Sequence, residues 1–366
     1  MTTHIKKILM VGSASSIHIR QWIVNIARLG FEIHLISQHD DLYELSTVDR
    51  CYFHRLPFLG GVGYILNIPF LLGLIKNIKP DVVNFHYATG YSAAARFVCD
   101  VPVVINAWGS DVYEFPTKSI LHKTWLTFNL KSASVIASTS FDMARVIKGL
   151  DKSLKCIEIT PFGVDVDKFR SVIDGDDKTI FVFGTVKSLH DKYGIDILIS
   201  AFALFLTREF LDRTFSNVEL HLVGDGPERV SLESLVVSLG LSDSVKFFGA
   251  VPHECVPEKL STLDVYCALS RQESFGVAVI EASSCGLPVI VSDAGGLPEV
   301  VVHGQTGFIT PVGDIEAICA AMQRLYHDRG LRETMGKNGR DFVVKNYSWQ
   351  VCTQKMLNTY KKAIEL

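Results

Sequence analysis

Two glutamates in the second half of the chain are the residues best suited to chemistry. Glu273 and Glu281 stand eight residues apart with Gly276 between them. The segment ends in Gly-Leu-Pro, which is typical of a helix that stops before a strand. We therefore expect a helix from about Phe275, with Glu273 just before its N-terminus and Glu281 about two turns in.

This spacing suits a ligand with two hydroxyl-bearing rings joined by a diphosphate. Eight helical residues span roughly 12 Å, about the distance from a sugar across a diphosphate to a ribose. Amides near Ser274, Phe275 and Gly276 suit the diphosphate, and Gly276 lets a ligand approach the backbone. Glu281 would accept the two ribose hydroxyls and Glu273 those of the second sugar. A pair of solvent-exposed helical glutamates is the alternative.

The elements that position these residues are indicated by short apolar runs without polar alternation. Each run is followed by a helical pattern. Such runs predict parallel strands covered on both faces. We expect strands at Ile8–Val11, Ile33–Ile36, Val82–Phe85, Val103–Ile105 and Val135–Ala137 in the first half. Those of the second half are Thr179–Phe183, Glu219–Val223, Val245–Phe248, Val265–Ala268 and Val289–Val291.

The chain of 366 residues is too long for one hydrophobic core. The pattern breaks at Thr160–Asp165, and a polar stretch at 174–178 precedes the next strand. We therefore expect one domain at 1–165 and another at 166–345. The last segment, 346–366, contains a helix that would cross back to the first domain. Two doubly wound α/β domains result.

Several motifs give this chain a specific resemblance. Residues 273–281 read E-x-F-G-x-x-x-x-E, and residues 282–299 continue as A-x-x-x-G-x-P-V-I-x-S-x-x-G-G-x-x-E. Val-Gly-Asp-Gly-Pro stands at 223–227, Phe-Phe-Gly at 247–249 and Thr-Gly-Phe at 306–308. Their order and spacing resemble the retaining glycosyltransferase family 4 over nearly the whole chain. The resemblance implies the GT-B fold, in which two Rossmann-like doubly wound domains face each other across a deep cleft.

The resemblance also implies a reaction. The first domain would bind an acceptor, and the second would bind a UDP- or GDP-sugar whose sugar passes to an acceptor hydroxyl with retained configuration. The sequence shows no obvious second carboxylate that could act as a covalent nucleophile. The leaving phosphate would therefore help to deprotonate the acceptor. No metal or other cofactor is expected. The acceptor would be a surface polysaccharide or a lipid-linked glycan.

A metal-independent enzyme of this kind needs fixed cations where charge develops on the departing diphosphate. Family members usually place an Arg where this chain has Thr185, so we expect Lys187 and Lys192 to replace it. The loop after the first strand is not a dinucleotide fingerprint, because it lacks G-x-G-x-x-G. The donor-binding set that the resemblance implies is Gly12, Ser13, Lys187, Lys192, Gly224, Val251, Ser274, Phe275, Gly276, Val277 and Glu281.

The catalytic residues are expected at the carboxyl ends of strands, where substrates bind in such sheets. Family members often carry a His near the transferred sugar where this chain has Trp108. This departure leaves His86 and Asp111, together with Glu273, as the predicted catalytic residues. Capping or hydrogen-bonding roles for His86 and Asp111 are the alternative. We expect His18 to be structural or to lie on the acceptor side.

Charge and cysteine usage exclude other classes. The net charge of −3 lacks the basic excess of a nucleic-acid binder. Residues 1–165 carry 16 Lys and Arg against 13 Asp and Glu, a slight positive balance that favours anionic partners or a membrane surface. Eight cysteines without a C-x-x-C indicate free thiols in a reducing cytoplasm. We therefore expect a cytoplasmic protein that contacts the inner face of the cell membrane.

The apolar stretch Leu56–Ile75 is interrupted by prolines and glycines. We expect a loop and a helix packed on the sheet, with a membrane-inserting segment as the alternative.

Two other functions remain open. One is a catalytically impaired sugar-nucleotide-binding protein, favoured by Trp108 and Thr185 and opposed by the two glutamates. The other is a sugar-nucleotide epimerase or a phosphorylase of similar architecture, which would not need the paired glutamates.

Overall fold

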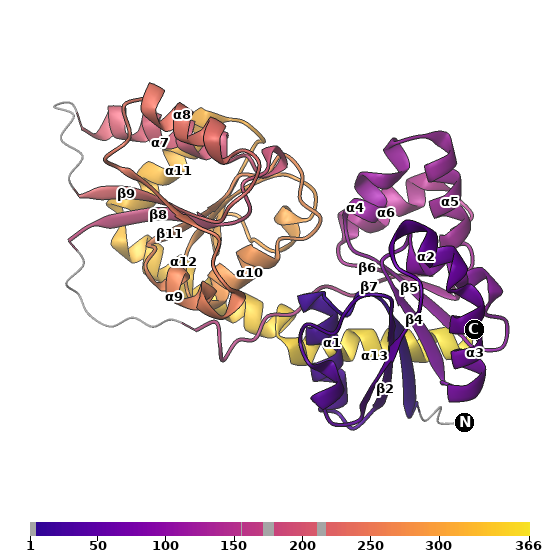
Figure 1. Ribbon diagram of the computed structural model, residues 1–366. Coiled ribbons are helices and arrows are strands. Elements are labelled where there is room, and N and C mark those ends of the chain that lie inside the picture. The colour runs from indigo at the N-terminus through magenta and orange to yellow at the C-terminus, as the bar shows by residue number, and fades with distance from the viewer. Residues whose placement is uncertain (1–4, 155, 171–178, 211–216) are drawn as a thin grey trace. The chain divides into compact units, whose positions relative to one another are not determined.

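Two parallel sheets organise the chain in the computed structural model, which describes residues 5–154, 156–170, 179–210 and 217–366. One unit consists of Met1–Gly163 and Trp349–Leu366, and the other of Val164–Ser348. Figure 1 colours the chain from end to end, so the yellow C-terminal helix can be found among the indigo and purple elements of the first unit. The polar stretch predicted at 174–178 lies outside the described residues.

The first unit holds seven parallel strands in the order β3-β2-β1-β4-β5-β6-β7. Their bounds are β1 Lys7–Val11, β2 Glu32–Ser37, β3 Cys51–Arg55, β4 Val82–His86, β5 Val103–Ala107, β6 Val135–Ser138 and β7 Ile157–Ile159. Its helices are α1 Ile17–Ala27, α2 Gly60–Leu66, α3 Ile68–Ile78, α4 Ser110–Tyr113, α5 Ile120–Leu130, α6 Phe141–Leu150 and α13 Trp349–Glu365, with 3₁₀ turns η1 Leu45–Thr47, η2 Tyr91–Phe97 and η3 Phe115–Thr117.

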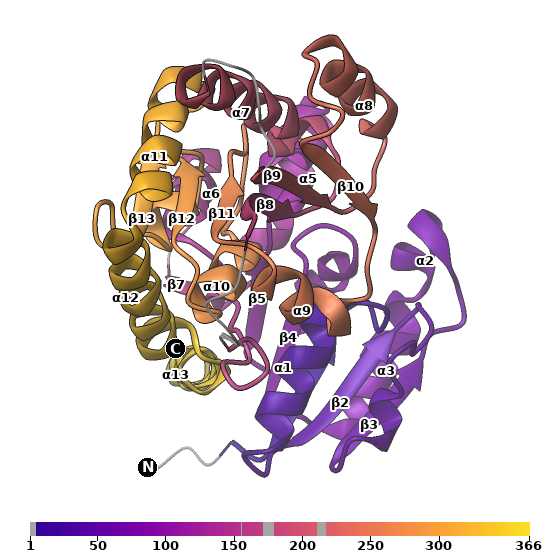
Figure 2. The ribbon, with the colours of Figure 1, turned by 90° about the vertical axis from the view of Figure 1, so that its left-hand side faces the viewer.

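The second unit holds six parallel strands in the order β10-β9-β8-β11-β12-β13, seen side by side in Figure 2. Their bounds are β8 Phe181–Val186, β9 Val218–Val223, β10 Val245–Gly249, β11 Val265–Ala268, β12 Val289–Ser292 and β13 Gly307–Thr310. Its helices are α7 Ile195–Glu209, α8 Arg229–Ser238, α9 Val256–Ser261, α10 Val277–Ser284, α11 Ile315–His327 and α12 Arg329–Tyr347, with 3₁₀ turns η4 Asp191–Tyr193, η5 His253–Cys255 and η6 Leu297–Glu299. The predicted α/β fold of two parallel, doubly wound sheets is confirmed.

The ten predicted strands all form, whereas β3, β7 and β13 were not predicted. Each of these three lies at the edge of its sheet. An edge strand is covered less completely, so its sequence need not be a continuous apolar run. Strand β3 reads Cys-Tyr-Phe-His-Arg and β7 has only three residues, so neither carries the pattern that identified the interior strands.

The helix α13 covers one face of the seven-stranded sheet together with α1. Trp349, at the start of α13, packs edge-on against Trp22 of α1, with ring centroids 5.0 Å apart. In the sheet, Asn84 of β4 lies beside Met10 of β1 and donates its side-chain amide to the Tyr360 hydroxyl, with the two atoms 2.5 Å apart. The last segment therefore belongs to the first unit, and the chain connects the two units twice.

The segment Leu56–Ile75 differs from the expected loop and single helix. It forms two helices, α2 and α3, whose axes differ by 51°. Leu71 and Ile75 of α3 are buried in the core with Leu56, so α3 does pack on the sheet. No single helix within the described ranges is long and apolar enough to cross a membrane, although α2 and α3 together pass that test by length and composition.

Candidate functional site

The second sheet reverses its strand order between β8 and β11. In doubly wound sheets, ligands bind at the carboxyl ends of the strands beside such a reversal. Strand β8 ends at Val186 and is followed at once by Lys187. Strand β11 ends at Ala268 and leads to Glu273. The topology therefore brings these two loops together at the carboxyl edge of the sheet.

Lys187 and Glu273 form the central ion pair of this edge. The Lys187 Nζ lies 2.7 Å from Oε2 of Glu273, and their side chains are only 18% and 10% exposed. Lys187 also lies over the ring of Tyr193, 4.3 Å from its centroid. Burial acts to lower the pKa of Lys187, but the fields of Glu273, Tyr193 and Tyr266 outweigh it and the pKa is raised. Lys187 therefore stays a cation at physiological pH.

Thr185, where the resemblance implied an Arg, is buried and carries no charge, so it cannot take this role. It is 1% exposed, and its side chain hydrogen-bonds to Tyr266 in the same unit. Lys187, two residues later, is the cation that reaches Glu273.

Gly224 supports the loop that carries Lys187. Its φ of +145° is accessible mainly to glycine, and a Cβ there would overlap the carbonyl oxygen of Lys187. The backbone amide of Lys187 donates to Val223 across a 2.9 Å bond, and that of Leu189 donates to Asp225 at the same distance. This geometry assigns Gly224 to backbone packing, and its predicted contact with the donor stays a prediction.

The helix α10 begins later than the sequence predicted. It starts at Val277, with Gly276 as its N-cap at φ +105°, and not at about Phe275. Glu281 is consequently a little over one turn into the helix, so the expectation of about two turns was wrong. The physical reason is the left-handed backbone of Gly276, which α-helical residues do not adopt.

The turn before α10 is held in place by the sheet edge. The amide of Gly296 donates to the Glu273 carbonyl over 3.0 Å, and a Cβ at Gly296 would lie 2.5 Å from the Ser274 carbonyl oxygen. The Phe275 side chain is buried, with its ring centroid 5.5 Å from that of Tyr347. Phe275 therefore anchors the turn, while Ser274 and Val277 are half-buried beside it.

Glu281 is paired with a histidine that the sequence reasoning did not single out. The Nε2 of His253 lies 2.9 Å from Oε1 of Glu281, and the two side chains are 34% and 11% exposed. His253 belongs to η5, two residues after Val251, on the connection that follows β10. Val251 is itself half-buried.

Lys192 lies next to the segment that leads to Glu273. Its carbonyl accepts the amides of Arg271 at 2.8 Å and of Gln272 at 3.2 Å. Its Nζ is 5.4 Å from the centroid of the Tyr193 ring. Lys187, Lys192, Glu273 and the start of α10 therefore gather at one edge of the second sheet.

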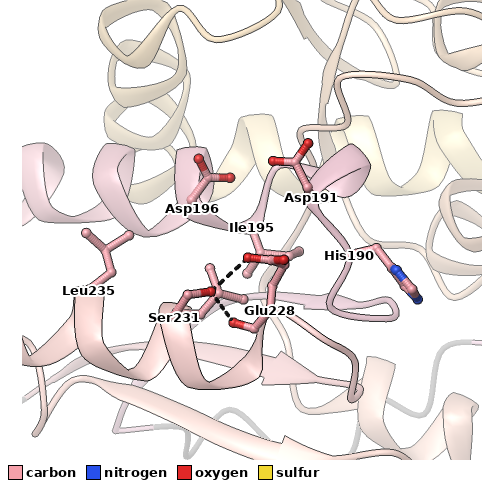
Figure 3. A pocket seen from close by; sticks show the side chains of 8 residues that line it. His190, Asp191, Ile195, Asp196, Glu228, Ser231 and Leu235 are labelled. Carbon is pink, nitrogen blue, oxygen red and sulfur yellow. Dashed lines mark hydrogen bonds between the residues drawn. The ribbon is translucent and has the colours of Figure 1, made fainter.

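A hollow of about 190 Å³ between α7 and α8 is a different feature, drawn in Figure 3. Asp191, Asp196 and Glu228 all line it, and Ser231 donates to the Glu228 carboxylate over 2.8 Å. Arg271 pairs with Asp191 and Asp196, but three carboxylates and one guanidinium still leave a net negative charge, which would repel a diphosphate. This hollow is therefore a poor site for a phosphorylated ligand. Across the described ranges of the chain, no three His, Cys, Asp or Glu side chains are placed to hold a metal.

The first sheet reverses its order between β1 and β4, and Gly12 and His86 lie at that reversal. A Cβ added to Gly12 would come within 3.1 Å of the His86 Cβ and would overlap Ile19 of α1. Gly12 thus allows α1 and β4 to approach closely. Ser13 follows it in the same turn, where its carbonyl accepts the amide of Ser16 at 3.0 Å.

His86 is buried and has no hydrogen bond to any residue that the structure describes. It is 1% exposed, and neither ring nitrogen has a partner among the described residues. Burial lowers the pKa of His86 to about 3, so the ring is neutral at physiological pH. A neutral imidazole has one donor and one acceptor, which suits a hydroxyl group.

His86 lies at one end of a chain of ring contacts that runs through Trp108 to Phe162 and His18. The ring of Trp108 lies 5.2 Å from that of His86 and 5.4 Å from that of Phe162. His18 stacks on Phe162 with ring centroids 4.2 Å apart. The His18 ring therefore takes part in the packing of the first unit.

Asp111 is fully engaged with backbone amides. Its carboxylate accepts the amides of Ala88 and Gly109, each at 2.8 Å, and that of Trp108 at 3.1 Å. Burial raises the pKa of Asp111, and these hydrogen bonds only partly offset that shift. The geometry assigns Asp111 to holding the turn at Trp108, and its predicted part in catalysis stays a prediction.

Known proteins resemble this chain over both units. The profile described as "Glycosyl transferases group 1" matches residues 165–342, and that described as "Glycosyl transferase 4-like" matches residues 7–140. N-acetyl-alpha-D-glucosaminyl L-malate synthase of Bacillus anthracis is 25% identical, covering 92% of this chain and 89% of its own length. The capsular polysaccharide biosynthesis glycosyltransferase CapM of Staphylococcus aureus is 27% identical, covering 93% of each chain.

Solved structures share the fold. The sucrose-phosphate synthase of Thermosynechococcus elongatus aligns with a TM-score of 0.81 at 21% identity, covering 97% of this chain and 98% of its own. HepE of Anabaena, crystallised with UDP-glucose, aligns with a TM-score of 0.78 at 19% identity, covering 98% of this chain and all of its own.

Proposed function

Because the chain belongs to the group 1 glycosyltransferases, we propose that it moves a sugar from a nucleoside diphosphate sugar to an acceptor hydroxyl with retained configuration. The second unit binds the donor, and the first binds the acceptor. The observation that carries this proposal is the half-buried Lys187–Glu273 pair at the reversal of the second sheet.

The donor's parts are matched to the groups at that edge. Lys187 supplies the fixed positive charge that a departing diphosphate needs, and Lys192 adds to it. The amides at the start of α10, opened by the left-handed Gly276, receive phosphate oxygens. With two cations and a helix N-terminus in place, the proposed reaction requires no metal ion.

Glu273 and Glu281 hold the hydroxyl groups at the two ends of the donor. Glu273 binds the sugar that is transferred, and Glu281 binds the ribose. When the donor is absent, Glu273 neutralises Lys187. When the donor binds, the Lys187 ammonium also donates hydrogen bonds to the diphosphate. Glu273 then accepts hydrogen bonds from the hydroxyls of the sugar. The leaving phosphate then takes the acceptor proton.

The nucleotide is UDP or GDP. HepE was crystallised with UDP-glucose. A relative from Mycolicibacterium smegmatis, 30% identical over 53% of this chain and of its own length, is named a GDP-mannose-dependent mannosyltransferase. Both nucleotides therefore belong in the first test.

We also propose that the acceptor is a lipid-linked glycan or a growing surface polysaccharide, met at the inner face of the cell membrane. The apolar patch of the first unit supports this: it consists of Phe58, Leu59, Val62, Ile65, Leu66 and Phe70, which are 40–68% exposed. No charged residue stands between Arg55 and Lys76. The patch follows the carboxyl end of β3, at the edge of the sheet that also carries Gly12 and His86.

The test is a panel of UDP- and GDP-sugars in a thermal-shift assay, followed by turnover. A donor that binds the folded protein raises its melting temperature. We expect at least one sugar nucleotide to do so and to release nucleoside diphosphate when lipid-linked acceptors are added. Lys187→Met should abolish the shift, whereas the exposed Lys337→Met should preserve it.

The alternatives give different results. Binding without release of nucleoside diphosphate, with varied acceptors, would indicate an impaired sugar-nucleotide-binding protein. Conversion of the donor into another sugar nucleotide without acceptor would indicate an epimerase. A panel in which no sugar nucleotide binds would contradict the proposed function.

A further inference from the structure

The contact between His253 and Glu281 has a defined direction. A carboxylate accepts hydrogen bonds but does not donate them, so the Nε2 of His253 must carry the proton at 2.9 Å from Oε1. This bond fixes one oxygen of Glu281, and the imidazole thereby sets the plane of the carboxylate. Oε2 and the second acceptor position of Oε1 remain oriented for other donors.

The two side chains differ in exposure. Glu281 is 11% exposed and His253 is 34% exposed, so the carboxylate is the more buried of the two groups. Few hydrogen bonds from water reach a carboxylate this deeply buried, and the bond from His253 is correspondingly important to its orientation. Without it, the Glu281 side chain could turn among other rotamers.

His253 is held in place by two residues near the start of the second unit, Lys168 and Phe169. Its carbonyl accepts the Lys168 ammonium at 3.4 Å, and its ring packs 5.6 Å from that of Phe169. The Phe169 ring is almost fully buried.

The backbone of Phe169 is fixed in turn. Its carbonyl accepts the Ser284 hydroxyl at 2.6 Å and the Arg340 guanidinium at 3.1 Å. Ser284 is the last residue of α10, the same helix that carries Glu281. A closed set of contacts therefore fixes the imidazole relative to the carboxylate.

We propose that His253 is a positioning residue for Glu281, which it orients to receive the two vicinal hydroxyls of the donor's ribose. This inference rests on the proposed function, because it takes Glu281 to be the ribose-binding carboxylate. It extends that function to a residue that does not itself bind the donor. Loss of His253 should therefore weaken only that part of the donor affinity that comes from the ribose hydroxyls.

The experiment measures the affinity of the full-length protein for UDP and for 2′,3′-dideoxy-UDP by calorimetry, with the GDP pair in parallel. We expect His253→Ala to weaken binding of the ribose nucleotide by about fivefold to thirtyfold, the effect of one ordinary polar interaction. Binding of the dideoxy nucleotide should not change. His253→Gln should restore most of the loss, because its amide can donate to the same carboxylate oxygen.

Two further variants complete the design. In a Glu281→Ala background, His253→Ala should cause no additional loss, because the imidazole acts through the carboxylate. His221→Ala is the control: its Nε2 lies 2.7 Å from Glu219 in a His–Glu pair within the strand β9. This control should leave nucleotide affinity unchanged.

The outcomes separate the two proposals. If UDP or GDP binds and His253→Ala has no effect, the inference is overturned while the proposed function stands. An equal loss for the ribose and dideoxy nucleotides also overturns it, since His253 would then act on another part of the donor. If neither nucleotide binds the wild-type protein, the proposed function fails and the inference fails with it.

Discussion

Two basic side chains of this protein, the half-buried Lys187 and the buried His86, have different charge states. Lys187 has a carboxylate and aromatic rings around it, and its pKa is raised. His86 has no hydrogen-bond partner among the described residues, and burial lowers its pKa to about 3. Lys187 is therefore a permanent cation, whereas His86 is a neutral hydrogen-bonding group and a weak base. A general base at physiological pH needs a higher pKa, so binding a hydroxyl suits His86 better.

The burial of neutral His86 makes the first unit sensitive to acid. The unfolded imidazole binds a proton below its ordinary pKa of about 6.5, while the folded one does not do so until about pH 3. The unfolded state thus binds more protons, and stability falls as the pH falls through this window. From pH 7 to pH 5 we expect the first unit to lose about 2 kcal/mol of unfolding free energy from this group.

Tryptophan fluorescence in urea titrations measures this change, because Trp22, Trp108, Trp125 and Trp349 all lie in the first unit. His86→Phe should remove the extra loss at pH 5, whereas His122→Phe on α5 should retain it. An unchanged pH dependence in His86→Phe would show that His86 is not the titrating group.

A polar contact fixes the docking of the helix α13 on its sheet. Tyr360 is fully buried, and burial raises the pKa of its hydroxyl. That hydroxyl lies 2.5 Å from the amide of Asn84, whose side-chain oxygen accepts the amide of Asn106. Apolar contacts alone would let a helix slide along a sheet. The bond to Asn84 defines one position for α13, at the centre of β4.

Removing that hydroxyl should destabilise the first unit. Tyr360→Phe leaves the buried Asn84 amide without this partner, which costs about 1–3 kcal/mol. We expect a correspondingly lower urea midpoint by tryptophan fluorescence, with the 52% exposed Tyr52→Phe as control. A midpoint equal to that of the wild type would mean that water or another group satisfies Asn84.

The sequence predicted strands well where a continuous apolar run corresponds to a strand that is buried on both faces. Interior strands are buried on both faces and appear as continuous apolar runs, so all ten predicted strands form. The three missed strands β3, β7 and β13 are edge strands that are short or of mixed composition, whereas the edge strand β10 was predicted. The start of α10 was placed about two residues early, because nothing in a plain residue pattern shows that Gly276 adopts a left-handed conformation.

The site could be predicted only where it is compact in sequence. Glu273 and Glu281 lie in one motif, and Lys187 in a loop of recognisable position. His253 precedes Glu281 by 28 residues and belongs to another strand's connection, so only the tertiary structure joins them. Likewise, the Asp111 carboxylate looks reactive in sequence, but it is occupied by backbone amides of its own turn and of Ala88.

The apolar patch on α2, α3 and the two residues before α2 is the surface that we expect to meet a membrane. Its six side chains are exposed on a segment without charge. Large exposed apolar areas mark binding surfaces. We expect the protein to float with vesicles of phosphatidylethanolamine and phosphatidylglycerol, with α2 inserted at the interface.

Replacing Leu59 and Val62 together by serine should weaken this vesicle binding by about tenfold or more, because two apolar side chains no longer leave water. The control is Val230→Ser with Val237→Ser on α8, where both side chains are also exposed, by 74% and 68%. Equal effects of the two pairs, or no flotation of the wild type, would contradict membrane contact through this patch.

The return of α13 to the first unit also determines the order in which the protein can fold during synthesis. The second unit is one continuous segment, complete once Ser348 has emerged from the ribosome. The first unit is begun earlier but finished later, since Trp349 and Tyr360 are translated after all of the second unit. Until then, one face of its sheet is without α13, and Trp22 and Asn84 lack their partners. Until α13 is made, the nascent chain therefore exposes apolar surface in the part that was made first, which favours aggregation.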